Sequence, residues 1–294
     1  MATRIGFLGL GRMGLPMAIN LAESGHAVTA YDISPQARES AENAKLDLAA
    51  DPQAAVREAE IVFTMLPDGA CVRALYDEML SAAAPDTLFI DCSTIDVASA
   101  RAVHAAAVEA GMQMLDAPVS GGVNGAKTGG LTFMVGGARE SCERARPILR
   151  TLGKRTVHCG GPGAGQAAKI CNNLILGVSM IAVCEAFVLA EDFGLSAQAL
   201  FDVASTSSGQ CWALNTYCPV PGPVPASPAN HGYEPGFSAA LMLKDLKLAG
   251  DAAAGGGATP LAGRAAQLYE EFVSAGHGGE DFSAIIRSIR KKTG

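Results

Sequence analysis

The sequence predicts two domains: an α/β Rossmann-type N-terminal domain and an all-α C-terminal domain, joined by a long helix. Three observations predict this. Short apolar strands alternate with helical segments through the first half, and a glycine-rich turn follows the first strand. A second glycine-rich turn then opens a long apolar run that reaches Leu189. Because 294 residues suit two domains, we place the Rossmann-type domain at 1–162 and the helical domain at 163–294.

The first elements predict a βαβ unit that binds a dinucleotide. We expect its strand, helix and second strand at 4–10, 15–24 and 27–32. Gly9 allows the tight turn, Gly11 lets a pyrophosphate approach the backbone, and Gly14 permits close packing of helix on strand. The helix N-terminus then stabilises the phosphate charge. The alternative is a glycine-rich turn in another kind of α/β protein.

Asp32 ends the second predicted strand and indicates which cofactor is bound. A carboxylate there accepts hydrogen bonds from a ribose and repels the additional phosphate of NADP. Ile33 and Ser34 follow it, and neither could bind that phosphate as an arginine would. We therefore expect NAD.

Further strands and helices continue the parallel sheet. Strands are expected at 60–65, 87–92, 112–117 and 155–159, helices at 69–83, 96–110 and 139–152, and a hairpin around 122–136. Ligands bind beyond the carboxyl ends of such strands. Leu66 and Thr94 lie at two of these ends, and Thr94 could also be the N-cap of the next helix. The remaining expected cofactor contacts are Met13, Pro67 and Cys71.

Ser120, Gly121 and Gly122 follow another strand end. A hydroxyl beside closely spaced backbone N–H groups forms a small anion site that suits a carboxylate. The alternative is an ordinary glycine turn.

Lys169 is unexpected in an apolar helix. We expect this helix to begin after a hinge at Gly160–Gly165, and its first turns also contain Asn172 and Asn173. Lys169 and Asn173 are four residues apart and share one face. A desolvated lysine has a lowered pKa and can exchange a proton near neutral pH. Alternatively, the lysine extends its ammonium group to the surface.

The second domain is predicted to be helical. Helices are expected near 196–205, from 237, and at 260–275 and 279–291. The proline-rich segment 218–228 is long for a loop, which suggests a functional cover or an intersubunit arm. Trp212, Tyr217 and Phe237 could form an apolar wall around a substrate, or pack in the core.

Composition argues against several classes of function. The net charge of −7, with a single basic cluster at 290–292, argues against nucleic-acid binding. Glu185 and Glu191 interrupt the apolar helix, in our interpretation too early for a membrane span. Eight scattered cysteines indicate reduced thiols and no structural metal. With no signal or transit peptide recognised, we expect a cytoplasmic protein.

Four motifs together resemble the β-hydroxyacid dehydrogenase family over essentially the whole chain. They are Gly-Leu-Gly-Arg-Met-Gly-Leu-Pro-Met at 9–17, Asp-Ala-Pro-Val-Ser-Gly-Gly at 116–122, Gly-x-Gly-x-x-x-Lys-x-x-x-Asn at 163–173, and Lys-Asp-Leu at 244–246. Residues 207–212 and 217–222 are similar to the hydroxyisobutyrate branch. Gln210 departs from the basic residue of some members.

The resemblance implies roles for several residues. Lys169 would be the catalytic acid/base, and residues 120–122 would bind the substrate carboxylate. Asn173 would help to hold the substrate, and Lys244 would lie near the nicotinamide. Apart from the resemblance, we expect Trp212 and Tyr217 to contact the substrate and Phe237 the cofactor.

The implied reaction is NAD-dependent oxidation of 3-hydroxyisobutyrate to methylmalonate semialdehyde, in valine catabolism. Alternatives are a related enzyme acting on tartronate, glyoxylate or succinic semialdehyde, or on an imine, and a non-catalytic dinucleotide-binding module. A non-catalytic module should lack Lys169. Since the Lys169 helix is apolar on nearly all sides, we also expect a homo-oligomer, dimer or tetramer, built on the helical domain.

Overall fold

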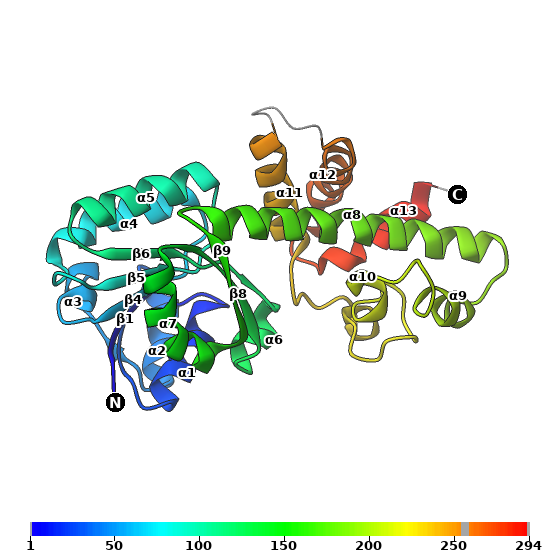
Figure 1. The fold of residues 1–294 in the computed structure, drawn as a ribbon. Helices are drawn as coiled ribbons and strands as arrows, with labels where there is room; N and C mark the ends of the chain where they lie inside the picture. Colours follow the sequence, from blue (N-terminus) through cyan, green and yellow to red (C-terminus); the bar gives the residue numbers. More distant parts are fainter. Residues whose placement is uncertain (1, 254–258, 293–294) are drawn as a thin grey trace. The chain divides into compact units, whose positions relative to one another are not determined.

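The computed structural model describes residues 2–253 and 259–292. The chain divides into two compact units, 1–169 and 170–294. Figure 1 shows an α/β first unit and a helical second unit.

The first unit is built on one sheet. Its described strands are β1 (Arg4–Leu8), β2 (Ala27–Tyr31), β3 (Asp47–Leu48), β4 (Ile61–Thr64), β5 (Leu88–Asp91), β6 (Gln113–Asp116), β7 (Val119–Ser120), β8 (Leu131–Gly137) and β9 (Gly153–Gly160). Their order is β3-β2-β1-β4-β5-β6-β8-β7, with β9 paired to β8. The first six strands are parallel, and β8 runs antiparallel to β6 and β7. The 3-2-1-4-5-6 order is that of dinucleotide-binding sheets, which confirms the predicted fold class.

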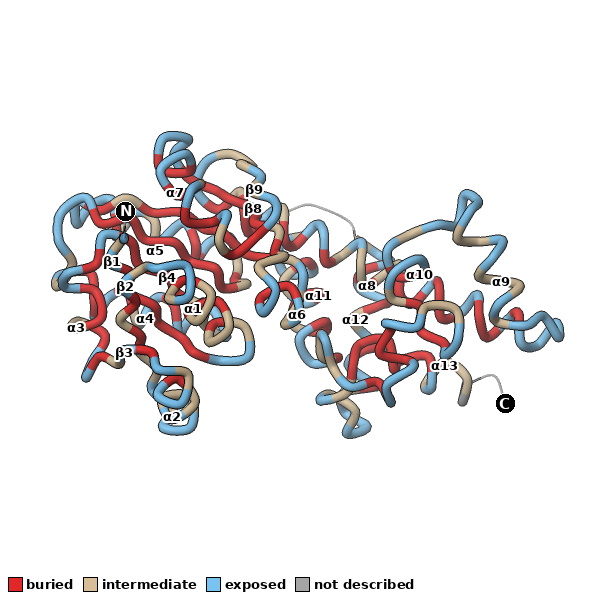
Figure 2. Tube along the Cα trace, turned by 90° about the horizontal axis from the view of Figure 1, so that it is seen from below, coloured by how far each residue is buried: buried red, intermediate tan, exposed pale blue. Residues whose placement is uncertain are grey.

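Both faces of the sheet are covered, as its apolar strands require. Alternate residues such as Phe7 and Phe63 pack with α1 (Gly14–Glu23) and α7 (Arg139–Leu152). Their neighbours in sequence, such as Val62, face the opposite helices. These helices are α3 (Pro52–Val56), α4 (Gly69–Met79) and α5 (Val97–Glu109). The strands form the buried centre of the unit in Figure 2.

Aspartate side chains begin the helices on this second face. Asp51, Asp68 and Asp96 each accept a hydrogen bond, of 2.7 to 2.8 Å, from the backbone three residues later. Each bond satisfies an N–H group that the helix itself leaves unpaired. Asp96 is the N-cap of α5, so the alternative role of Thr94 as that N-cap was wrong.

The second unit is helical, with α8 (Ala164–Asp192) running into it from the first. Its other described helices are α9 (Ala197–Ala204), α10 (Trp212–Asn215), α11 (Ala239–Ala253), α12 (Pro260–Phe272) and α13 (Ile286–Lys292), together with short turns at Pro228–His231, Val273–His277 and Phe282–Ile285. Buried side chains including Phe187, Met242 and Tyr269 form its core.

Three expectations about local structure were wrong or incomplete. Between the second strand and residue 60 the chain forms α2 (Pro35–Asn43), β3 and α3, none of which was predicted. The expected hairpin near 122–136 contains a helix, α6 (Gly122–Lys127), before β8. The expected helix from 279 begins as a 3-10 turn and becomes α-helical at Ile286.

The proline-rich segment 218–228 is anchored within the helical unit, and its expected role as a functional cover or an intersubunit arm stays a prediction. Cys218, Val220 and Ser227 are buried, and the Ser227 hydroxyl donates to the Cys218 carbonyl at 2.6 Å. The Tyr233 hydroxyl donates to the Pro219 carbonyl at 2.8 Å. Both ends of the segment are therefore fixed within the helical unit.

The expectation that α8 is too interrupted to span a membrane was wrong on length and composition. Its most apolar 18-residue window has a mean hydropathy of 2.1. Half of that window is buried, and the core helix of a soluble protein passes the same test. The absence of a membrane partner stays a prediction.

Asp281 connects several segments of the helical unit. Its fully buried carboxylate accepts hydrogen bonds from the Tyr217 hydroxyl, the Ser283 hydroxyl and three backbone N–H groups, at 2.7 to 3.2 Å. Burial raises its pKa and these hydrogen bonds act in the opposite direction. The carboxylate thus fixes Phe237 and Tyr217 relative to one another.

We expect Asp281→Ala to lower the free energy of unfolding by about 3 kcal/mol or more, because several buried donors lose their acceptor. The midpoint of urea unfolding, followed by the fluorescence of Trp212, measures the change. Asp202→Ala removes an exposed aspartate bonded to Gln198 and should change stability by about 0.5 kcal/mol at most. Equal midpoints for the two variants would contradict this role.

Candidate active site

The glycine-rich turn lies where the strand order reverses, between β1 and β4. The Gly9 N–H donates to the Tyr31 carbonyl at 2.9 Å, with a φ of 98° that favours glycine. A Cβ at Gly9 would collide with the Met65 carbonyl, and one at Gly14 with the Gly9 carbonyl. A Cβ at Gly11 would meet no atom within 4 Å. The turn is therefore packed tightly at both ends and open at its centre, as a pyrophosphate site requires.

Asp32 is held beside this turn. The Leu10 N–H donates to one carboxylate oxygen at 2.6 Å, and the Ser34 N–H donates to the other at 2.7 Å. Each oxygen keeps a further lone pair for a ribose hydroxyl. Ile33 is 86% exposed, so its side chain takes no part in the core.

The ends of β4 and β5 are joined by a buried chain of hydrogen bonds. The Leu66 N–H donates to the Ser93 hydroxyl at 2.8 Å, which donates to Asp91 at 2.6 Å. The Thr64 hydroxyl donates to the same Asp91 oxygen at 2.8 Å. Burial raises the pKa of Asp91 to about 6, against the effect of these hydrogen bonds. The chain fixes the backbone at Leu66, one of the predicted cofactor contacts.

Three other predicted cofactor residues lie in neighbouring loops and turns. Met13 immediately precedes α1, and Pro67 and Thr94 follow β4 and β5. Cys71 is exposed in the first turn of α4, where its N–H donates to Asp68.

The predicted carboxylate site lies between β7 and α6. Ser120 ends β7, and Gly121 and Gly122 have φ values of 132° and 60°, in the region that favours glycine. Ser120 and Gly122 are partly buried and Gly121 is exposed. The Ser120 hydroxyl and the backbone N–H groups of Gly121 and Gly122 thus come from one short turn. Their role in binding a carboxylate stays a prediction.

Lys169 is buried in the first turns of α8, with only 7% of its surface exposed. The alternative of a lysine that reaches the surface was therefore wrong. The turn before it is fixed by Asp116, at the end of β6. This carboxylate accepts the Gly163 N–H at 2.8 Å and the Gln166 N–H at 2.9 Å. Burial raises the pKa of Asp116, and these N–H groups act in the opposite direction.

The second unit brings its predicted site residues into two groups. Trp212 and Phe237 lie on either side of a set of rings, with Tyr217 stacked on Trp212 at 4.7 Å and on Phe282 at 5.3 Å. Trp212 is half exposed, so this set is not wholly core. Asn173, near the start of the unit, donates to Asp245 and accepts from Asn172 at 3.0 Å. Lys244 is the neighbour of Asp245 in sequence.

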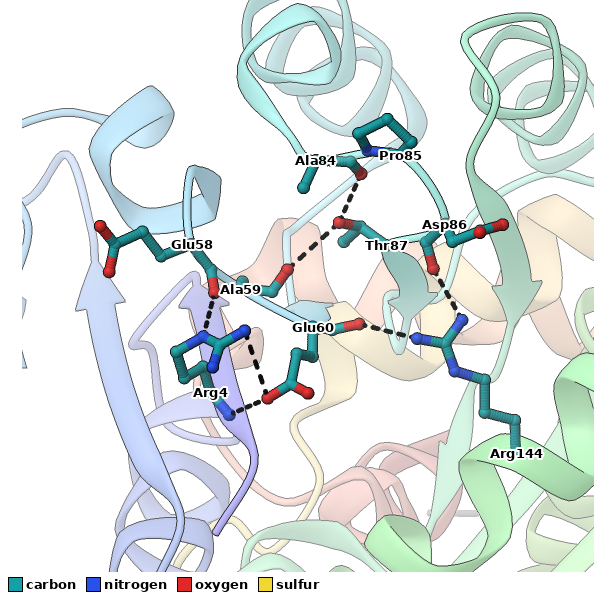
Figure 3. Close-up of a pocket in the computed structure, with 9 residues that line it drawn as sticks. All are labelled: Arg4, Glu58, Ala59, Glu60, Ala84, Pro85, Asp86, Thr87 and Arg144. Carbon is teal, nitrogen blue, oxygen red and sulfur yellow. Dashed lines mark hydrogen bonds and ion pairs between the residues drawn. The ribbon is translucent and has the colours of Figure 1, made fainter.

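At the opposite edge of the sheet lies a cavity of about 440 Å³ (Figure 3). Its two arginines donate to backbone carbonyls: Arg4 to Glu58 at 2.7 Å, and Arg144 to Asp86 at 2.6 Å. These bonds tie together the loops that precede the strands. The cavity lies at the amino ends of the strands, away from the edge where such sheets bind ligands.

Comparisons with known proteins support one family. Residues 4–161 match the NAD-binding domain of 6-phosphogluconate dehydrogenase, and residues 163–289 match the NAD-binding domain of NADP-dependent 3-hydroxyisobutyrate dehydrogenase. A probable 3-hydroxyisobutyrate dehydrogenase of Mycobacterium bovis is 54% identical over 99% of both chains. The chain belongs to the β-hydroxyacid dehydrogenase family. It is therefore an NAD-binding oxidoreductase.

Other members of this family refine the comparison. An NAD-dependent L-serine dehydrogenase of Pseudomonas aeruginosa is 45% identical over 96% of both chains. A solved structure of Mycobacterium tuberculosis 3-hydroxyisobutyrate dehydrogenase with L-serine is 54% identical, with a TM-score of 0.95, over 99% of this chain and all of that one.

Asp91, Asp116 and Gln166 were not predicted as functional residues of this dehydrogenase. Asp116 is the first residue of one family motif and Gln166 is at a variable position of another, and neither position indicates the hydrogen bonds that the residue makes. For Asp91 the only signal in the sequence was an acidic residue at the end of an apolar strand. Among residues 2–253 and 259–292, no three histidine, cysteine or acidic side chains are grouped as metal ligands would be.

The pKa of Asp91 predicts a pH-dependent stability. In the folded protein the pKa of Asp91 is about 6, so it retains its proton up to about that pH, whereas in the unfolded chain the carboxyl has its ordinary pKa of 3.8. Its stabilising contribution is complete at low pH and is lost as pH rises through 6. Asp91→Asn, which stays neutral, should therefore gain stability relative to wild type between pH 4 and 7, by up to about 3 kcal/mol.

Urea unfolding at several pH values measures this difference. Asp77→Asn, which changes an exposed aspartate on α4, is the control. An Asp91→Asn difference that depends on pH no more than that of the control would contradict the neutral carboxyl.

Proposed function

We propose that this enzyme oxidises 3-hydroxyisobutyrate with NAD to methylmalonate semialdehyde, as a step of valine catabolism. The observation that carries the proposal is the buried Lys169. The chain that contains it is 54% identical, over 99% of its length, to a probable 3-hydroxyisobutyrate dehydrogenase. A buried amine on the helix that follows the dinucleotide-binding sheet is suited to exchange the substrate's hydroxyl proton.

In the proposed reaction one group of residues binds the substrate and Lys169 exchanges its proton. The Ser120 hydroxyl and the N–H groups of Gly121 and Gly122 hold the substrate carboxylate. Lys169 accepts the hydroxyl proton as the carbonyl forms and returns it in the reverse direction. As an ammonium group it also stabilises negative charge on the substrate oxygen.

The residues proposed to bind the cofactor follow the carboxyl ends of neighbouring strands, at one edge of the sheet. The open turn at Gly11 would hold the pyrophosphate and Asp32 the ribose, with Leu66 and Thr94 beside the rest of the molecule. Bound NAD supplies the hydride acceptor. In the helical unit, Lys244 and Phe237 would add contacts to the cofactor, and Asn173, Trp212 and Tyr217 to the substrate.

L-Serine is the second candidate substrate. One solved relative is described with L-serine, and another relative is named for its oxidation. Both acids are primary alcohols β to a carboxylate, and they differ in whether C2 carries a methyl or an ammonium group. The same carboxylate site and the same lysine serve either one.

Values of kcat/KM for a panel of acids test the proposal, with NAD and NADP for the hydroxyacids and, in the reverse direction, with NADH and NADPH for the aldehydes. The panel contains both enantiomers of 3-hydroxyisobutyrate, L-serine, tartronate semialdehyde, glyoxylate and succinic semialdehyde. We expect 3-hydroxyisobutyrate with NAD to give the highest value. A higher value for L-serine would make the enzyme a serine dehydrogenase, and a preference for a semialdehyde would overturn the proposal.

We also propose a cytoplasmic homo-oligomer built on the helical unit. Large apolar side chains near the C-terminal end of α8 and on α9 are exposed in the single chain: Leu189, Phe193, Leu195 and Val203. Phe193 is 77% exposed, and a set of such residues is typical of an interface. Light scattering at micromolar concentration measures the mass, and a monomer would contradict assembly without affecting the proposed reaction.

Lys169→Ala should lower kcat by about 10²–10⁴-fold, since it removes the acid/base. The dissociation constant of NADH, measured by fluorescence, should change little because the lysine acts on the substrate proton. Lys154→Ala, at an exposed position on β9, should keep the wild-type kcat. A Lys169→Ala enzyme with more than about a tenth of the wild-type kcat would contradict the role.

Asp32→Ser combined with Ile33→Arg should shift preference toward NADP, because it removes a repulsive carboxylate and adds a phosphate partner. The ratio of kcat/KM for the two cofactors measures the shift. Asp47→Ser, at an exposed position on β3, is the control. An unchanged ratio in the double variant would mean that Asp32 does not contact the ribose.

A further inference from the structure

Gln166 is a fully buried amide in the first turn of α8, three residues before Lys169. Its side chain bonds to the loop between β5 and α5. The amide nitrogen donates to the Ser93 carbonyl at 2.7 Å, and the amide oxygen accepts the Ile95 N–H at 3.1 Å. These two partners lie on either side of Thr94, a predicted cofactor contact. One side chain therefore fixes the backbone around Thr94.

The backbone of Gln166 makes a separate connection. Its N–H donates to Asp116 at the end of β6, and the other oxygen of that carboxylate accepts the Gly163 N–H. A negative charge on the Asp116 carboxylate interacts favourably with the N–H groups that the first turn of a helix leaves unpaired. Gln166 thus links the loop after β5, the end of β6 and the start of α8.

At Gly165 the backbone of α8 lies directly against the sheet. A Cβ at Gly165 would collide with the Met134 carbonyl, and one at Gly136 would lie 2.7 Å from the Gly165 nitrogen. The helix backbone rests directly on the strands, so a displacement of its first turn moves Lys169 by a similar amount. Proton transfer requires the donor and acceptor within about 2.6–3.2 Å.

We infer that Gln166 is a positioning residue, which sets Lys169 relative to the loop that contains Thr94. The inference rests on the proposed function, because it assumes that Lys169 exchanges the substrate proton. A misplacement of about 1 Å can cost on the order of 10²-fold in rate, so hydrogen bonds remote from the reacting atoms can control kcat.

Gln166→Glu tests this with little change of shape. A protonated glutamic acid can still donate to the Ser93 carbonyl and accept from the Ile95 N–H, whereas the ionised form can accept from Ile95 but cannot donate to the Ser93 carbonyl. Burial and the nearby carboxyls of Asp116 and Asp91 favour the protonated form, and Lys169, one turn further along, favours the ionised form when charged. The variant should therefore lose its donor as pH rises.

The measured quantity is the ratio of the variant's kcat to that of wild type, from pH 6 to 9. We expect a ratio within about threefold of one at pH 6, and of about one tenth or lower at pH 9. The NADH dissociation constant should stay within about threefold of wild type, since the glycine-rich turn is unchanged. Gln113→Glu is the matched control: this glutamine at the start of β6 only accepts, from Ser141 at 3.0 Å, and its ratio should not vary with pH.

Gln166→Met provides a neutral variant of similar length that lacks both hydrogen bonds. Its kcat should fall about tenfold or more at every pH, with KM little changed. If wild type is active, either of two results would overturn the inference. One is a normal kcat in Gln166→Met, and the other is a kcat ratio in Gln166→Glu that does not vary with pH. Loss of folding in both variants, seen by circular dichroism, would assign Gln166 to stability and overturn it too. A wild-type protein that oxidises neither 3-hydroxyisobutyrate nor L-serine would overturn the proposed function itself, and this inference with it.

Discussion

The contact between the first turn of α8 and the ends of β6 and β8 determines where the lysine of this enzyme lies. Gly136 and Gly165 allow the two backbones to touch, and Asp116 holds two N–H groups of the helix start. A long helix that begins in an open loop would place Lys169 loosely. Here the sheet defines its position, and the sheet is also what places the glycine-rich turn and Asp32.

The fold class could be predicted from sequence because periodicity and glycine placement depend on local geometry. Strands covered on both faces are apolar throughout, and the glycines of the first turn are required by contacts a few residues away. The elements between 33 and 59 were missed for the opposite reason. β3 has two residues and α3 has five, too short for a pattern to emerge. Similarly, α6 begins with glycine and was interpreted as part of a hairpin.

The candidate site was predicted unevenly. Lys169 could be found because a charged residue is conspicuous in an apolar helix, and Asp32 because its spacing from the turn is fixed by one βαβ unit. The roles of Asp116 and Gln166 depend on hydrogen bonds between residues 47 to 73 positions apart, which no local pattern reveals. Asp281, which fixes Tyr217 and Phe237, likewise acts on residues 44 to 64 positions away.

Buried carboxyls recur wherever loops must be held. Asp91 and Asp116 lie at strand ends of the first unit, and Asp281 lies in the second. In each, burial raises the pKa, hydrogen bonds act in the opposite direction, and the carboxyl holds backbone N–H groups. In the proposed reaction Lys169 exchanges the proton and the cofactor accepts the hydride.

Transfer of deuterium tests that central claim most directly. The enzyme is incubated with NAD and 3-hydroxyisobutyrate deuterated at C3, and the reduced cofactor is analysed by mass spectrometry and proton NMR. The account predicts one deuterium at C4 of the nicotinamide, with the same result for L-serine deuterated at C3 if that acid is turned over. Reduced cofactor without deuterium, or no reduced cofactor from either acid, would contradict it.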